Sequence, residues 1–414
     1  LNAIRNGKKV TVVIELQARF DEEANIFWSN KLQEEGAHVI NGIPGLKVHC
    51  KLAWIQRKEK NGLRNYAYIG TGNFHEGTAR VYADKGLLTA DQEIANDVAN
   101  MFEFFKHTYY HFNYNQIIIS PFSMRNFFVH KIDQEIANTK KGKPAYMILK
   151  MNSLIDPQMI DKLYEASQAG VKIQLIIRGI FGLKTGDAKL SKNIEAISIV
   201  DKFLEHTRVF LFANGGKDDI YISSADWMPR NLDRRIEVAC PIYAPEIRNE
   251  LKELLRIQLR DNTKARILDS ELSNRYNNQT NGQRYRAQED YHTYIKKRHQ
   301  NLMKFYHNPR CSKSREGLKY LEEKGFEVEV IDYMKNGITP KEIKEFLSKS
   351  GLLVADIIRT NEELYKLNYK GKEFSDEEWI QILVENPKLI QRPLVIKGTH
   401  AVLARPVEEI QKLI

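Results

Sequence analysis

One short motif occurs twice in this chain, and it constrains the fold more than any other feature. The first copy is His49-Cys50-Lys51, followed by a small-residue loop at Gly70-Thr71-Gly72-Asn73. The second copy is His206-Thr207-Arg208, followed by Ser223-Ser224-Ala225-Asp226. Because side chains alternate along a strand, a histidine and a cation two residues apart would share one face of it. The repeat therefore predicts two related halves, each with an imidazole and a cation side by side on a strand.

The segments around each copy alternate between strand and helix patterns. In the first half we expect strands at residues 9–16, 38–40 and 47–55, and a helix at 21–35. In the second half we expect strands at 145–151, 170–177, 209–212 and 220–223, and helices at 157–168 and 245–259. This order predicts a layered α/β fold for each half.

A third unit is expected from Met303 onwards. It has strand patterns at 304–306, 327–333 and 394–396, a helix that starts at Cys311, and several short helices before Pro393. We therefore divide the chain into domains at residues 1–116, 117–290 and 303–414, with a linker at 291–302. Because the third unit opens with a methionine, it could be a complete protein joined to the first two.

Charge and composition narrow the functional classes. The 414 residues include 63 Lys and Arg against 53 Asp and Glu, and the net charge of +10 suits a polyanionic partner. These cations are scattered rather than gathered into one arm, so the charge alone does not identify the partner. We expect no nucleic acid. No apolar run reaches the ~20 residues of a membrane span, and three cysteines at unrelated spacings indicate a reducing cytoplasm. The chain opens with Leu1 rather than a methionine, so we expect further sequence before it.

Two histidines beside cations and small loops are the groups that phosphoryl transfer needs. A neutral imidazole can attack phosphorus, while Lys51 and the loop ending at Asn73 hold oxygens and a second imidazole protonates the leaving group. A single histidine on a strand is usually structural, but its recurrence in the same context favours a shared site. Arg178 and Arg235 are further phosphate-binding candidates, although each could instead form a salt bridge.

The duplicated motif resembles that of the phospholipase D superfamily, which adds an aspartate five residues after the lysine. Gln56 and Ala213 stand at those positions, which disfavours a phosphodiesterase. Longer segments resemble the two C-terminal catalytic domains of bacterial polyphosphate kinase, over residues 1–300. These segments are VTVVIELQARFDEEAN, GLKVHCKL, YIGTGNFHEGTARVYAD, AISIVDKFLEHTRVFLFANGG and YISSADWMPRNLDRRIEVA.

This resemblance implies reversible transfer of the ATP γ-phosphoryl group through a phosphohistidine at His49 to polyphosphate. His206 would assist and contact the nucleotide, and Mg²⁺ would screen the phosphate charges. The other residues implied are Tyr82 against the adenine, Arg178 and Arg235 as phosphate clamps, and Arg19 at the magnesium site. The family has two further domains before these, which contribute to nucleotide binding and dimerisation. We therefore expect little kinase turnover from this chain alone, and a homo-oligomer is possible.

The last quarter of the chain contains a separate thiol pattern. Cys311 stands at the start of the expected helix with arginines beside it, and a helix N-terminus and cations both favour a thiolate. Arg359, Arg392 and Arg405 are candidate donors to an oxyanion. A solitary cysteine is inert in most proteins, so the pattern alone leaves an inert thiol open.

The segments HNPRCSKSR, IIRTN, QRPLVI and ARP resemble the arsenate reductase family, which has a thioredoxin-like fold with a helical insertion. The resemblance implies that Cys311 attacks arsenate and that His307 tunes its thiolate. It also implies that Arg359, Arg392 and Arg405 bind the oxygens, and that Pro393 occupies the cis-proline position. Ser314 stands where a Cys-x-x-Cys pair would need its second cysteine, so reduction would use glutathione with glutaredoxin.

Three interpretations remain open. The first is a fusion of the catalytic half of a polyphosphate kinase with an arsenate reductase-like domain. The second is a phospholipase D-type phosphodiesterase, and the third is a polyanion-binding fragment in which only the C-terminal domain is active.

Overall fold

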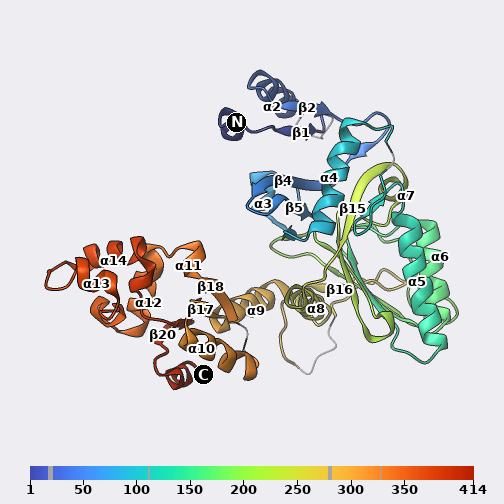
Figure 1. The fold of residues 1–414 in the computed structure, drawn as a ribbon. Coiled ribbons are helices and arrows are strands. Elements are labelled where there is room, and N and C mark those ends of the chain that lie inside the picture. Colours follow the sequence, from blue (N-terminus) through green and yellow to red (C-terminus); the bar gives the residue numbers. More distant parts are fainter. Residues whose placement is uncertain (17–21, 111, 278–281, 327) are drawn as a thin grey trace. The chain divides into compact units, whose positions relative to one another are not determined.

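The structure, a computed structural model, describes residues 1–414 except 17–21, 111, 278–281 and 327, and except the side chains of 299–301 (Figure 1). It divides into two compact units, Leu1–Asp290 (unit 1) and Tyr291–Ile414 (unit 2). Helix α9 Ala287–Asn301 runs through most of the expected linker, and the finer domain borders stay a prediction. None of the described helices combines the length and apolar character that a membrane crossing demands.

The first half of unit 1 forms small separate sheets. After the short helix α1 Asn2–Arg5, strand β1 Thr11–Ile14 pairs in parallel with β2 His38–Asn41, and α2 Glu22–Glu34 lies between them in sequence. Strands β4 Lys51–Glu59, β5 Gly62–Gly70 and β7 Gly86–Thr89 form an antiparallel sheet, with the short helix α3 Glu76–Ala79 before β7. Helix α4 Gln92–Lys106 packs on β4 and β5. The half is therefore α/β as expected, but its strands do not form one layer.

The second half of unit 1 is built on a large mixed sheet. Its strands follow the order β16 Ala265–Ile267, β11 Ile194–Ile199, β10 Lys172–Ile177, β9 Tyr146–Met151, β13 Arg208–Phe212, β14 Asp219–Ser223, β15 Arg235–Pro241 and β3 Lys47–Val48, and β8 Ile118–Ser120 pairs with β15. Helices α5 Met124–Lys140 and α6 Pro157–Gln168 cover one face and α8 Pro245–Leu259 lies on the other (Figure 1). The short helix α7 Pro229–Asp233 precedes β15.

Strand β9 shows why this sheet is covered on both faces. Phe128 of α5 and Leu163 of α6 pack with Leu149 of β9 in one buried core. Because side chains alternate along the strand, Ile148 and Lys150 point to the opposite face, where α8 lies. Asp156 starts α6 by accepting a hydrogen bond from the backbone of its first turn, and a proline follows it.

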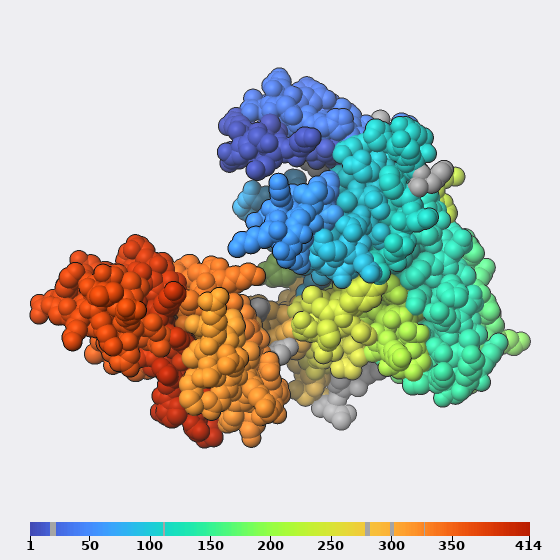
Figure 2. All heavy atoms as spheres, viewed as in Figure 1, coloured from blue at the N-terminus to red at the C-terminus, as the bar shows by residue number. Residues whose placement is uncertain are grey.

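The two halves of unit 1 exchange short strands. β3, from the first half, pairs in parallel with β15 of the second half, and β12 Leu204–Glu205, from the second half, pairs in parallel with β6 Tyr82–Ala83 of the first. The halves are in direct contact in the space-filling view, where the first runs from blue to cyan and the second from green to yellow (Figure 2). This exchange places both histidine motifs at the contact between the halves.

Unit 2 contains a mixed sheet in the order β18 Val328–Asp332, β17 Met303–His307, β19 Leu394–Lys397 and β20 His400–Leu403. Its helices are α10 Ser312–Glu323, α11 Tyr333–Asn336, α12 Pro340–Ser350, α13 Glu363–Asn368 and α14 Asp376–Glu385. Helices α11 to α14 lie between β18 and β19 in sequence, as a helical insertion. The peptide bond between Arg392 and Pro393 is cis, as expected.

Candidate functional site

A strand of the second half holds the backbone of the first histidine. The N–H groups of His49 and Cys50 both donate to the carbonyl oxygen of Ile236 in β15, each at 3.0 Å. Two successive residues opposite one partner make a β-bulge, which bends a strand and re-aims its side chains. For this reason β3 ends before His49, and β4 starts only at Lys51.

The second histidine repeats this arrangement. The N–H groups of His206 and Thr207 both donate to the carbonyl oxygen of Ala83 in β6, at 3.2 and 3.0 Å, and β13 starts at Arg208. The expectation that each His-x-cation motif lies on one continuous strand is therefore wrong in both copies. The strand is interrupted because the histidine and the residue after it share a single acceptor.

A carboxylate from the opposite half holds each imidazole. Nδ1 of His49 lies 2.9 Å from the carboxylate of Glu237, whose side chain is 0% exposed. Nδ1 of His206 lies 2.7 Å from the carboxylate of Asp84. A carboxylate at Nδ1 fixes the tautomer of a neutral imidazole and leaves the lone pair on Nε2. Sequence reasoning missed both acids.

The small-residue loops reach these carboxylates through hydroxyl groups and a glycine. Thr71 donates to Asp84 at 2.7 Å, and Ser224 donates to Glu237. A Cβ atom on Gly72 would stand 2.2 Å from a carboxylate oxygen of Asp84, so this position requires glycine. Each loop thus fixes the acid that holds the histidine of the other half.

The cation of each motif turns back onto its own histidine. Nζ of Lys51 donates to the carbonyl oxygen of His49. Nη1 of Arg208 donates to the carbonyl oxygen of His206 at 2.7 Å and also lies 3.1 Å from its Nε2. Asp226 holds Arg208 through an ion pair of 3.2 Å. Only the second copy therefore brings its cation onto the imidazole ring.

Two further residues expected at the site lie beside the second histidine. The ring of Tyr82 stands 5.0 Å from that of His206, centroid to centroid, at an interplanar angle of 53°. Nε of Arg178 donates to Asn152 and to the carbonyl oxygen of Glu205, each at 2.7 Å. The structure therefore brings Tyr82 and Arg178 together with His206.

For the remaining expected residues we describe no contact with either histidine. Arg235 starts β15 and is half-buried, Asn73 is exposed, and Arg19 lies outside the described residues. The described residues include no group of three or more His, Cys, Asp or Glu side chains that could hold a metal ion. A signal for the missed acids was available, since each stands two residues after Tyr82 or Arg235.

Burial is the largest influence on the pKa of both imidazoles. It lowers the pKa of His49 and His206 below the ordinary 6.5, although Glu237 and Asp84 act in the opposite direction. Burial also lowers the pKa of Lys51 to about 8. Both imidazoles are therefore neutral at pH 7, which is the form that can act as a nucleophile or accept a proton.

In unit 2, Cys311 is the N-cap residue of α10 and is half-buried. Burial by itself raises the pKa of its thiol, but the backbone N–H of Ser314 and the side chain of Arg392 outweigh it and hold the pKa below the ordinary 9.0. The thiolate is thus favoured by the helix N-terminus and by a guanidinium.

Three arginines gather beside this cysteine. Burial lowers the pKa of Arg359, and the positive charges of Arg392 and Arg405 lower it further. Arg359 is paired with Glu362, and Arg405 donates to Gln391 at 2.8 Å. Nε of Arg392 is buried without a hydrogen-bond partner among the described residues. An oxyanion at this position would supply that partner.

His307 contacts Ser314 in this unit. Its Nδ1 lies 2.9 Å from the hydroxyl of Ser314, which also accepts the backbone N–H of Asn308 at 3.0 Å. Ser314 therefore orders the loop before the cysteine, a role that its sequence position did not indicate.

Comparison with known proteins finds different matches for the first three quarters and for the end of the chain. The description "Polyphosphate kinase C-terminal domain 1" matches residues 1–111, and "Polyphosphate kinase C-terminal domain 2" matches residues 117–288. Residues 1–288 belong to the polyphosphate kinase family. The family member from Vibrio parahaemolyticus is 50% identical over 296 residues, which is 72% of this chain and 42% of that protein. The one from Escherichia coli K12 is 49% identical, over 72% of this chain and 43% of its own length.

A solved structure supports the fold of the same residues. Polyphosphate kinase from Porphyromonas gingivalis is 42% identical and gives a TM-score of 0.67, over 72% of this chain and 45% of that chain. This chain thus spans less than half the length of the polyphosphate kinases it matches.

The end of the chain belongs to a second family. The description "ArsC family" matches residues 306–413. A solved arsenate reductase from Vibrio cholerae is 38% identical over 27% of this chain and 98% of its own, with a TM-score of 0.27. The expected fold class is confirmed, with two phospholipase D-like α/β domains followed by a thioredoxin-like domain.

Proposed function

We propose that unit 1 transfers the γ-phosphoryl group of ATP reversibly to polyphosphate through a phosphohistidine at His49. The unequal surroundings of the two Nε2 atoms support this choice of nucleophile. Nε2 of His206 lies 3.1 Å from Arg208, whereas no described residue donates to Nε2 of His49. With Nδ1 of His49 held by Glu237, its Nε2 lone pair is available to phosphorus.

The proposed step forms one bond and breaks one bond. Nε2 of His49 attacks the γ-phosphorus, the bond to the β,γ-bridging oxygen breaks, and ADP leaves with the electron pair. A terminal oxygen of polyphosphate then attacks the phosphorus and frees His49, and the reverse sequence makes ATP. Positive charge that develops on the imidazole faces the buried carboxylate of Glu237, which stabilises it.

The other site residues would bind and orient the substrate. We assign His206 to assistance of the transfer and Tyr82 to the adenine, with phosphate contacts from Lys51, Asn73, Arg178 and Arg235. Mg²⁺ would arrive on the phosphates of ATP as part of the substrate. None of the proposed steps requires a metal ion that is bound by the protein itself. The role of Arg19 near the magnesium ion is proposed from the family resemblance alone.

One assay tests this proposal against the phosphodiesterase alternative. The full chain is incubated with γ-labelled ATP and Mg²⁺, and we expect an acid-labile, alkali-stable phosphoprotein that His49→Ala eliminates. His130→Ala, at an exposed histidine on α5, is the matched control and should keep the label. A label that survives His49→Ala contradicts the proposal, and cleavage of a phosphodiester without a label favours a phosphodiesterase.

For unit 2 we propose reduction of arsenate by Cys311. The thiolate attacks arsenic and an arsenate oxygen leaves as water. The thiol of glutathione then attacks the sulfur of Cys311, a mixed disulfide forms, and arsenic leaves with the electron pair as arsenite. Two thiols supply the two electrons, and glutaredoxin reopens the disulfide. The low thiol pKa and the guanidiniums of Arg359, Arg392 and Arg405 support this chemistry.

The matched test uses two cysteines of the same chain. Cys311→Ser should abolish glutathione-dependent arsenate reduction, while Cys50→Ser, in unit 1, should retain it. Reduction that survives Cys311→Ser shows that the sulfur of Cys311 is not the nucleophile.

A further inference from the structure

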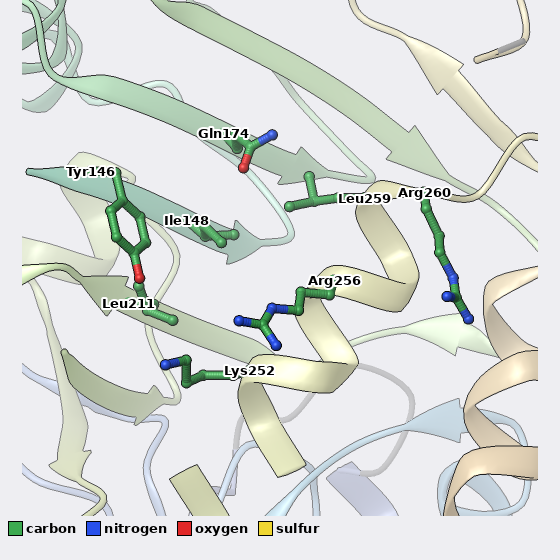
Figure 3. Close-up of a pocket in the computed structure, with 8 residues that line it drawn as sticks. All are labelled: Tyr146, Ile148, Gln174, Leu211, Lys252, Arg256, Leu259 and Arg260. Atoms are coloured by element: carbon green, nitrogen blue, oxygen red, sulfur yellow. The ribbon is translucent and has the colours of Figure 1, made fainter. Parts of the chain in front are cut away.

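Unit 1 contains a groove lined by residues that the histidine site does not use (Figure 3). Its volume is about 400 Å³. Tyr146 and Ile148 of β9 and Leu211 of β13 line its sheet side, and Lys252 and Arg256 of α8 line the opposite side. A volume of this size, with mostly apolar walls and few polar groups, is typical of small-molecule sites.

The groove lies at the opposite end of β9 from the histidine site. Ile148 stands opposite Leu211 in the antiparallel pair of β9 and β13. Tyr146 starts β9, whereas Asn152, which holds Arg178, follows its last residue. At ~3.3 Å per residue, Tyr146 and Asn152 are separated by about 20 Å. A ligand in the groove therefore leaves the histidine site open.

Arg256 offers a guanidinium that can bind an anion. Its side chain is 66% exposed, and its ion pair with Glu253 measures 3.7 Å. That is longer than the ~2.7–2.9 Å of a charge-assisted hydrogen bond, and exposed ion pairs contribute little to stability. Arg256 can therefore exchange Glu253 for a phosphate, whose oxygens fit the guanidinium fork.

Two other side chains that line the groove, Lys252 and Tyr146, are held in place by Asp218. Lys252 pairs with Asp218, and the hydroxyl of Tyr146 donates to the same carboxylate at 2.9 Å. Figure 3 shows Lys252 and Arg256 extending from α8 towards the strands, with Arg260 apart at the end of the helix. The groove thus combines an ordered aromatic ring with the exchangeable cation of Arg256.

We propose that this groove binds a mononucleotide, with its base on the apolar wall and its phosphate at Arg256. A planar base covers Ile148, Leu211 and the ring of Tyr146, and the burial of this apolar surface favours binding. A bare polyphosphate chain fits poorly, because its charges would lose water against aliphatic side chains without gaining hydrogen bonds. Gln174 also lies in the wall, where its Nε2 donates to Glu195 at 3.3 Å. This inference does not depend on the proposed phosphoryl transfer.

Photolabelling of the full chain with 8-azido-ADP, followed by peptide mapping, tests this site. We expect label at residues 146–148 or 252–260 rather than around Asn152, protected by excess ADP and retained in Arg178→Ala, which weakens the histidine site. Arg256→Glu should weaken this protection about tenfold, because a charge-assisted phosphate contact is lost and a repulsive one replaces it. Arg256→Lys should keep part of the affinity.

Lys192→Glu is the matched control, since Lys192 is an exposed cation in the turn before β11, outside the groove. The Lys192→Glu variant should be photolabelled in the groove, and protected by ADP, to the same extent as the parent chain. Label confined to peptides around Tyr82 and His206 overturns the proposal, as does groove labelling that Arg256→Glu leaves unchanged. If tripolyphosphate displaces the groove label as well as ADP does, the groove is a polyphosphate site and the assignment to a nucleotide is wrong.

Discussion

Replacement of Glu237 by glutamine removes the charge that faces the first histidine and keeps the shape of the side chain. The carboxylate of Glu237 accepts hydrogen bonds from His49 at 2.9 Å, from Asn231 at 2.6 Å and from Ser224. The new amide can be accommodated because Oδ1 of Asn231 is buried and has no partner among the described residues. Rotation of that amide would let Asn231 accept a hydrogen bond instead of donating one. We therefore expect Glu237→Gln to fold normally.

The expected effect on the reaction follows from the lost interaction. A buried hydrogen bond to a charged group contributes about 1.5–3 kcal/mol. If the full amount stabilises the charge on His49 during attack, phosphorylation slows by a factor of about 10–150. The pKa of His49 should fall further below its ordinary value, because burial lowers it and the charge of Glu237 opposes that shift.

Rapid-quench labelling with γ-labelled ATP measures the rate, and NMR titration of His49 measures the pKa. Asp84→Asn, the equivalent change at the second histidine, is the matched control and should slow labelling less, because His206 only assists the transfer. Labelling of Glu237→Gln at the parental rate with an unchanged melting temperature would refute the reasoning. An upward shift of the pKa of His49 would refute it as well.

Three further predictions concern other charged groups. The kcat/KM of labelling should decline above pH 8, because Lys51, with its pKa lowered to about 8, loses its positive charge there. In Lys51→Arg the decline should begin at a higher pH, because a guanidinium stays charged. Glu205→Ala should cost about 3–5 kcal/mol in urea unfolding, because it leaves Lys150 buried without its partner at 2.9 Å; adding Lys150→Met should recover much of that loss. Arg392→Gln should raise the pKa of Cys311 and slow its alkylation by iodoacetamide at pH 7. Mass spectrometry measures the alkylation rate, and an unchanged rate would contradict the stabilisation of the thiolate by Arg392.

Much of the organisation could be predicted from local patterns. The helix at residues 157–168 coincides with α6, and the strands expected at 170–177, 209–212 and 220–223 lie within two residues of β10, β13 and β14. Apolar periodicity and capping residues act over a few neighbouring positions, so a sequence shows them directly. The histidines, Lys51 and Cys311 could be singled out for the same reason, since their motifs are contiguous.

The site itself depends on partners far apart in the chain. His49 and Glu237 are 188 residues apart, and His206 and Asp84 are 122 residues apart. No local pattern encodes such a pairing.

By itself, then, the sequence determined the residue types, the duplication and the order of the domains. Only the tertiary structure decided that each half holds the histidine of the other. It does so because strands β3 and β12 pair across the halves, which bulges each motif and brings a distant carboxylate to each Nδ1. It also made the two imidazoles unequal, since Arg208 reaches one ring and Lys51 turns to a backbone oxygen.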